Sequence, residues 1–159
     1  MSAFTHYLLK SAQRTLVTSA AAGLLSSAML VYRSRTDTGR YAAALNAPSH
    51  WIWGQRALRQ DSATLAHTAV GAAVHQGATI FWAALFEYLQ SRHVRRTPVN
   101  AMVDAALVTT AAAVVDLKLV PRSLSPGFEH RLSGRSLVMV YGVLAVGLAV
   151  GGVLAGRRR

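Results

Sequence analysis

The stretch LVMVYGVLAVGLAVGGVLA, residues 137–155, decides the fold class of this chain. It contains no charged, histidine, asparagine or glutamine side chain, and its only polar side chain is Tyr141. Its length is close to the roughly 20 residues that an α-helix needs to cross a hydrocarbon core of about 30 Å. Its apolar character continues all the way round, as expected of a helix that meets lipid or protein on every side. The stretch therefore predicts a transmembrane helix.

Three further apolar stretches of comparable length lie upstream, at residues 15–32, 63–89 and 99–120. We therefore predict an all-α polytopic membrane protein with four transmembrane helices, in a single membrane domain that comprises residues 1–159. We expect these helices to form two antiparallel hairpins, with the first two helices in one and the last two in the other. The short basic link SRHVRRTP indicates that the second and third helices are also antiparallel neighbours.

The connection between the first two apolar stretches, residues 33–61, is the longest in the chain. A loop of this length is usually functional or partly structured. Pro48 and Gly54 divide it, and we predict one or two short helices that lie at the membrane surface. Trp51 and Trp53 are predicted interfacial anchors, because an indole ring can be buried at the membrane–water interface and still donate a hydrogen bond.

The net charge of +11 comes from basic residues that flank every apolar stretch. Nucleic-acid binding explains this pattern poorly, because that activity gathers basic residues in one domain with interleaved aromatic side chains. Anionic lipid headgroups are the expected partners, at about 1 kcal/mol for each basic side chain near the surface. The absence of cysteine excludes disulfides, iron–sulfur clusters and thiol nucleophiles.

The topology places both termini on one side of the membrane, because the number of spans is even. Basic residues close to the spans favour the cytoplasmic side. Their totals on the two sides are nearly equal, but their density is higher in the short terminal segments, which end in the basic run 157–159. We expect a multi-pass protein of a bacterial inner membrane with cytoplasmic termini. The excess of arginine over lysine fits a GC-rich bacterial genome.

The distal segment DLKLVPRSLSPGFEHRLSGRSLVMVYGVLAVGLAVG, residues 116–151, resembles the C-terminal half of small uncharacterised bacterial inner-membrane proteins. The resemblance covers this part of the chain only. It implies a location in the same kind of membrane, and no activity is attached to it.

Polar side chains within spans are costly and are considered first as functional candidates. When the helix centres are aligned, at about 1.5 Å per residue, four such side chains are expected in the same half of the bundle. These are His67, His75, Asp116 and Tyr141. One hypothesis is a site for protons or a small polar ligand, since an imidazole titrates near neutral pH. The other is interhelical hydrogen bonding that only fixes the packing.

These residues do not predict a metal or cofactor site. His67 and His75 would lie about 12 Å apart along one helix, whereas a Zn–N bond is about 2 Å long. Haem held by two histidines would need opposed helices, and the other three apolar stretches contain no histidine. We therefore expect neither a metal nor a cofactor.

Two further sets of residues are predicted to hold helices together. Arg14 could extend along the membrane interface to form an ion pair with Asp104. Glycines four residues apart stack on one helix face and allow two backbones to approach closely, within the chain, in a homo-oligomer or against other membrane proteins. The last apolar stretch and the residue that follows it contain two such pairs, Gly147 with Gly151 and Gly152 with Gly156.

Three functional classes fit these features. The chain contains no P-loop, HExxH, GxSxG or dinucleotide-binding motif, so a non-enzymatic accessory or scaffolding membrane component is the first expectation. The alternative is a small oligomeric transporter or channel that uses the buried His/Asp/Tyr cluster. The third is a lipid-modifying enzyme at the interface, with His50, Glu129 and His130 as acid–base candidates. No catalytic residue is otherwise indicated.

Overall fold

The computed structural model describes residues 2–157 of the chain. All regular structure in these residues is helical, and four helices are long and apolar enough to cross a membrane. They are α1 (Ala3–Thr38), α4 (Val70–Arg92), α5 (Pro98–Val114) and α6 (Gly134–Arg157). The predicted all-helical class with four membrane-length helices is therefore confirmed. Residues 158–159 of the basic C-terminal run lie outside the described part of the chain.

The first helix extends beyond the predicted 15–32 at both ends. Ser2 caps its first turn through the side-chain oxygen. It ends only at Gly39, whose positive φ of 73° allows its N–H to bond to the carbonyl oxygen of Arg35. Hydropathy marks the part of a helix that suits lipid, whereas the backbone stays helical until a residue such as glycine ends it. This difference explains the longer helix.

The second and third long helices each adjoin a wider, π-helical turn in the same half of the molecule. η3 (Leu65–Ala69) precedes α4, and η4 (Val115–Leu119) follows α5. With these turns included, both segments nearly match their predicted stretches. π-helical turns are rare and frequently occur at functional sites. The second of them carries Asp116.

The predicted long loop contains short helical pieces. They are α2 (Ala43–Asn46), η1 (Ala47–Ser49), α3 (His50–Trp53) and η2 (Gly54–Arg59). Many of their residues are buried, so the segment is packed onto the bundle. Its position at a membrane surface stays a prediction.

Asn46 joins this segment to the start of the second long helix. Its side-chain amide donates to the carbonyl oxygens of Gln60 and Ser62, at 2.9 and 3.0 Å, and its oxygen accepts from Thr68 at 2.7 Å. Gly71 lets α4 approach the backbone here, because a Cβ at this position would lie 2.0 Å from the carbonyl oxygen of Leu45. The buried amide of Asn46 therefore connects three segments: α2, the chain that follows η2, and the η3 turn.

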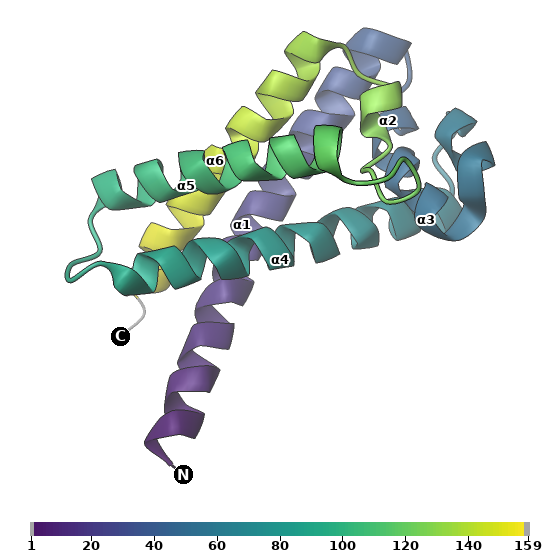
Figure 1. The fold of residues 1–159 in the computed structure, drawn as a ribbon. Helices are drawn as coiled ribbons and strands as arrows, with labels where there is room; N and C mark the ends of the chain where they lie inside the picture. Colours follow the sequence, from purple (N-terminus) through teal and green to yellow (C-terminus); the bar gives the residue numbers. More distant parts are fainter. Residues whose placement is uncertain (1, 158–159) are drawn as a thin grey trace.

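The helices pack in a crossed arrangement in which α4 and α5 lie side by side across α1 and α6 (Figure 1). The most extensive packing joins α1 to α6, which run antiparallel, with the backbone N–H of Ser133 bonded to Asp37 at the end of α1. Packing of α1 against α4 is less extensive. The predicted hairpin of the first two helices is not confirmed, because the first helix packs mainly on the last.

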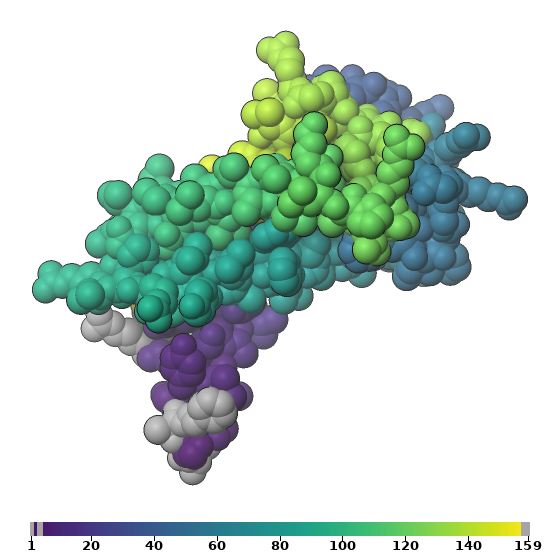
Figure 2. Space-filling model, viewed as in Figure 1, coloured from purple at the N-terminus to yellow at the C-terminus, as the bar shows by residue number. Residues whose placement is uncertain are grey.

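The core between the helices is built from a few large side chains and many small ones. Leu30, Phe86, Val108 and Leu148 are almost completely buried, together with alanines from every long helix. The N-terminal turns of α1 project beyond this body (Figures 1 and 2). Where two helices cross and only small side chains lie between them, the bundle contains a hollow.

Candidate ligand-binding cavity

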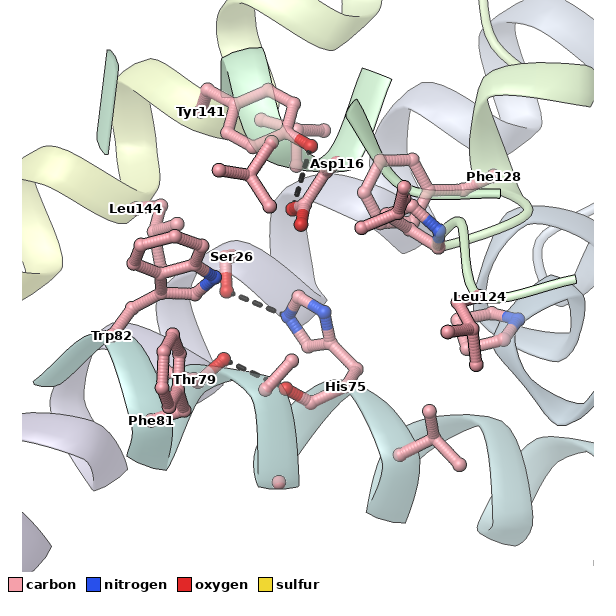
Figure 3. Close-up of a pocket in the computed structure, with 18 of the residues that line it drawn as sticks. Ser26, His75, Thr79, Phe81, Trp82, Asp116, Leu124, Phe128, Tyr141 and Leu144 are labelled. Atoms are coloured by element: carbon pink, nitrogen blue, oxygen red, sulfur yellow. Dashed lines mark hydrogen bonds between the residues drawn. The ribbon is translucent and has the colours of Figure 1, made fainter. Parts of the chain in front are cut away.

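A cavity of about 410 Å³ lies between α1, α4, α6 and the chain that follows α5 (Figure 3). Its wall is mostly apolar. The apolar side chains that line it include Val74, Phe81, Trp82, Val115, Leu124, Phe128, Val140 and Leu144. Ionisable groups reach it from three elements: His75 on α4, Asp116 on η4 and Tyr141 on α6. A mostly apolar cavity with a few convergent polar groups is typical of a small-molecule site.

His75 is buried in the second turn of α4 and contacts the first helix. Its Nε2 atom lies 2.8 Å from the hydroxyl of Ser26. The edge of the Phe128 ring packs against the imidazole, with the ring centres 6.4 Å apart. These contacts come from segments far apart in the sequence, and together they hold the ring in one orientation.

The hydroxyl of Ser26 lies within hydrogen-bond distance of two groups, the carbonyl oxygen of Ala22 and Nε2 of His75, each at 2.8 Å. A hydroxyl carries a single hydrogen and donates it to only one of them. When Ser26 donates to Ala22, Nε2 of His75 carries the ring hydrogen and Nδ1 is an acceptor; when Ser26 donates to His75, Nδ1 carries the hydrogen and is a donor. In either tautomer, Nδ1 has no hydrogen-bond partner among the described residues.

Asp116 and Tyr141 form the second polar pair of the cavity. The Tyr141 hydroxyl donates to Oδ2 of Asp116 at 3.0 Å (Figure 3). The Phe128 ring also packs against the tyrosine ring, at 6.2 Å between centres. Phe128 therefore lies between the two polar pairs and contacts both of them.

The cavity offers a defined set of hydrogen-bonding groups to a ligand. Nδ1 of His75, Oδ1 of Asp116 and the indole N–H of Trp82 have no hydrogen-bond partner in the described part of the chain. The carboxylate oxygen is an acceptor and the indole N–H is a donor. A carboxylate only accepts, and the tyrosine hydrogen is already committed. The head of a fitting ligand would therefore donate at least one hydrogen bond, as hydroxyl and amine groups do.

The structure brings together three of the four polar residues predicted to cluster. His67 does not join His75, Asp116 and Tyr141 around the cavity. Its Nδ1 atom lies 2.9 Å from the hydroxyl of Thr64, which caps the η3 turn. The prediction assumed regular, nearly parallel helices. The π-helical turn and the crossing of the helices change which side chains meet.

Sequence reasoning did not identify Ser26, Trp82 or Phe128 as members of the site. Ser26 lies among other small residues of the first apolar stretch. Phe128 lies in a connection that carries two prolines. No local signal marks these residues, because their role comes from contacts with other helices.

The ion pair expected between Arg14 and Asp104 is not formed among the described residues. Asp104 instead accepts hydrogen bonds from Gln90 at 2.7 Å and from His93 at 2.9 Å. The reason is the order of packing: α5 lies against α4 and α6, whereas α1 also packs on α4 and α6 and has no extensive contact with α5. Gln90 and His93, at the end of α4 and just after it, occupy the carboxylate of Asp104 in place of Arg14.

The two tryptophans predicted as interfacial anchors are about half exposed, and both indole N–H groups are satisfied. Trp51 donates to the carbonyl oxygen of Ser125 at 2.9 Å, and Trp53 donates to that of Ala66 at 3.0 Å. Trp51 also borders the cavity. Contact with a membrane interface stays a prediction for both.

The predicted glycine pairs differ in what they contact. A Cβ at Gly147 would lie 2.5 Å from the Cα of Ala22, and one at Gly151 would lie 2.7 Å from the Cα of Thr18. This pair therefore packs on α1 of the same chain. Gly152 lies against the ring of Phe86, whereas a Cβ at Gly156 would meet no atom within 4 Å.

Metal binding and acid–base catalysis by the loop residues have less support in the described residues. They contain no group of three or more His, Cys, Asp or Glu side chains that could hold a metal ion. Of the loop residues considered as acid–base candidates, His50 is buried, with Nε2 2.9 Å from the carbonyl oxygen of Ser125. Glu129 and His130 approach each other to 3.6 Å. None of the three lines the cavity.

No family model matches this chain, and no curated protein or solved structure is similar to it at a significant level.

Proposed function

We propose that this chain is a non-enzymatic, multi-pass membrane component that holds a small amphipathic molecule in the cavity beside His75. One observation carries the proposal: an apolar cavity of about 410 Å³ receives His75, Asp116 and Tyr141 from three different helical segments. The apolar wall suits a hydrocarbon body. The free carboxylate oxygen of Asp116 and the free ring nitrogen of His75 suit a hydroxyl or amine head.

The location is part of the same proposal. The chain would lie in a bacterial inner membrane with both termini in the cytoplasm and the segment α2–η2 at the opposite surface. The higher density of basic residues in the short terminal segments supports this orientation, and the resemblance of the distal segment supports the bacterial inner membrane. Trp51 and Trp53 would then meet the headgroup region, where their half-exposed rings suit the interface.

The proposal is tested by native mass spectrometry of the full-length protein, extracted in a mild uncharged detergent from its own membrane. We expect a bound molecule of lipid-like mass that organic extraction releases and identifies. His75→Ala and Asp116→Asn should each lower its occupancy about tenfold, because each removes a hydrogen bond to the ligand in a mostly apolar site. His67→Ala is the matched control, since this histidine lies outside the cavity, and should leave the occupancy unchanged.

Two outcomes would contradict this function. Wild-type protein that carries no small molecule at any detergent concentration would show that the cavity is only a packing feature. Equal loss of ligand in His75→Ala and His67→Ala would place the binding elsewhere. Folding of every variant is checked by its thermal unfolding in the same detergent.

Transport is the second candidate, favoured by ionisable groups that lie within membrane-length helices and face a cavity. Four helices enclose little space, so a transport pathway would need several copies of the chain. The same spectra separate the roles by stoichiometry. A homo-oligomer with bound ligand favours transport, whereas a stoichiometric foreign subunit favours the accessory role.

A further inference from the structure

The opposite end of the bundle contains a second, basic hollow. Here the start of α1, the turn between α4 and α5 and the end of α6 surround a cavity of about 790 Å³. Lys10 and Arg14 reach it from α1, and Arg95 and Arg96 reach it from the turn. We propose that this basic pocket binds a phosphate group, either of an anionic lipid headgroup or of free phosphate. The proposal is independent of the cavity beside His75.

Helix geometry brings two of the four basic side chains together. Lys10 and Arg14 are four residues apart on α1, so they lie on the same face of the helix. Both also line two smaller neighbouring hollows, of about 380 and 150 Å³, and Arg96 lines the smaller of these. Positive charge is therefore concentrated where α1 passes the turn between α4 and α5.

Local acidic groups neutralise only part of this charge. Glu87 is bound to Arg96 at 2.7 Å and accepts from Thr18 at 2.7 Å. Asp104 is bound to Gln90 and His93, as described above. Among the described residues, no ion pair compensates Lys10, Arg14 or Arg95. The pocket therefore keeps an excess of positive charge that an anion would balance.

Arg14 supplies a specific donor. Its Nε atom is buried and has no hydrogen-bond partner within the part of the chain that the structure describes. A buried donor without a partner is unfavourable, and the planar guanidinium group matches the oxygens of a phosphate in a fork-like geometry. A phosphate in the pocket would bind the guanidinium group of Arg14, and its charge would be shared with Lys10 and Arg95.

The other wall of the pocket is small and apolar, formed by Ala101, Gly152, Val153 and Gly156. A Cβ at Gly156 would meet no atom within 4 Å, so this part of α6 is open. The pocket thus combines a basic rim with an apolar groove along a membrane-length helix. Basic pockets of this kind between transmembrane helices bind anionic headgroups.

The test uses full-length protein in an uncharged detergent, titrated with dioleoylphosphatidylglycerol, dioleoylphosphatidylcholine or inorganic phosphate, with bound species counted by native mass spectrometry. The site variant is Arg14→Gln with Arg95→Gln. The matched control is Arg56→Gln with Arg59→Gln. These two exposed arginines of η2 lie outside the pocket, and replacing them removes the same amount of charge. Arg14→Lys retains the charge but lacks the forked donor.

We expect the wild-type protein to prefer phosphatidylglycerol over phosphatidylcholine. The site variant should bind it about 25-fold more weakly, from a loss of about fivefold for each basic side chain. The control should change affinity less than about twofold, and Arg14→Lys should fall between wild type and the site variant. If inorganic phosphate binds with the same dependence on Arg14 and Arg95, the phosphate site stands and its source is a soluble anion.

Equal weakening in the site variant and the control would show diffuse attraction of charge and overturn the proposal. Absence of any preference for phosphate-bearing anions in the wild type would overturn it as well. Should the double variant fail to fold, Arg95→Gln alone provides the same comparison, since Arg95 is exposed on the turn and Arg59→Gln is its matched control.

Discussion

At the scale of single residues, buried charge in this chain is tolerated through specific partners. Glu87 is buried near the end of a membrane-length helix, where it accepts a hydrogen bond from Thr18 and pairs with Arg96 at 2.7 Å. A buried charge without a partner would be strongly unfavourable. The ion pair therefore connects α4 to the turn that follows it, and the threonine connects α4 to α1.

Glu87→Ala is expected to lower the free energy of unfolding by about 2 kcal/mol, because Arg96 and Thr18 lose their partner. A fully buried pair would lose roughly 3–5 kcal/mol, but Arg96 is partly exposed and can turn to solvent. Equilibrium unfolding in mixed detergent micelles measures the change. Glu129→Ala, which breaks a looser contact with His130, should change stability by less than about 1 kcal/mol. Equal effects of the two substitutions would refute the assigned role of Glu87.

At the scale of elements, the contact between α1 and α6 depends on glycine. Gly147 and Gly151 place the backbone of α6 directly against Ala22 and Thr18 of α1. The spacing of these glycines indicated close packing of some kind, but their partner could have been a second chain. In the structure the partner is the first helix of the same chain, so this face is not available for an oligomer.

Gly147→Ala should destabilise the protein by about 1–3 kcal/mol, because the added methyl would lie 2.5 Å from the Cα of Ala22 and the helices must separate. Gly142→Ala is the matched control on the same helix, where a Cβ meets no atom within 4 Å. It should be neutral or more stable by up to about 1 kcal/mol, from the higher helix propensity of alanine. Stability is measured as for Glu87. If both alanine variants are equally stable, the packing of α1 on α6 is wrong.

At the scale of the whole molecule, the chain closes on itself by packing its first long helix on its last. Asp37 near the end of α1 accepts a hydrogen bond from Ser136 at the start of α6, and Arg33 donates to the same serine at 2.9 Å. With α1 packed on α6, the helices α4 and α5 lie across these two helices. The cavity beside His75 and the basic pocket then occupy opposite ends of the bundle.

The closure can be tested by cross-linking, because the chain contains no cysteine of its own. Arg33→Cys with Ser136→Cys should react efficiently with a short bifunctional thiol reagent in native membranes. Tyr7→Cys with Ser136→Cys, which places the first thiol at the far end of α1, should not react within one chain. Peptide mass spectrometry identifies the linked products. Efficient linking of the second pair and none of the first would reverse the arrangement.

The sequence by itself determined the class of the protein and the approximate position of its four long helices. Length and hydropathy are properties of each segment taken alone, and the bilayer requires about 20 apolar residues per span. The same local information identified His75, Asp116 and Tyr141 as unusual, since polar groups are costly within apolar helices. It also marked the glycines of α6, because spacing of four places them on one face.

Only the tertiary structure decided which of these residues meet. The prediction placed His67 in the cluster and paired Arg14 with Asp104 by counting along straight, aligned helices. In the structure the helices cross, and the π-helical turns shift the face on which following residues lie. Ser26 and Phe128 join the cavity from segments far from His75 in the chain. Such contacts depend on the packing of all the helices at once, and no single segment contains that information.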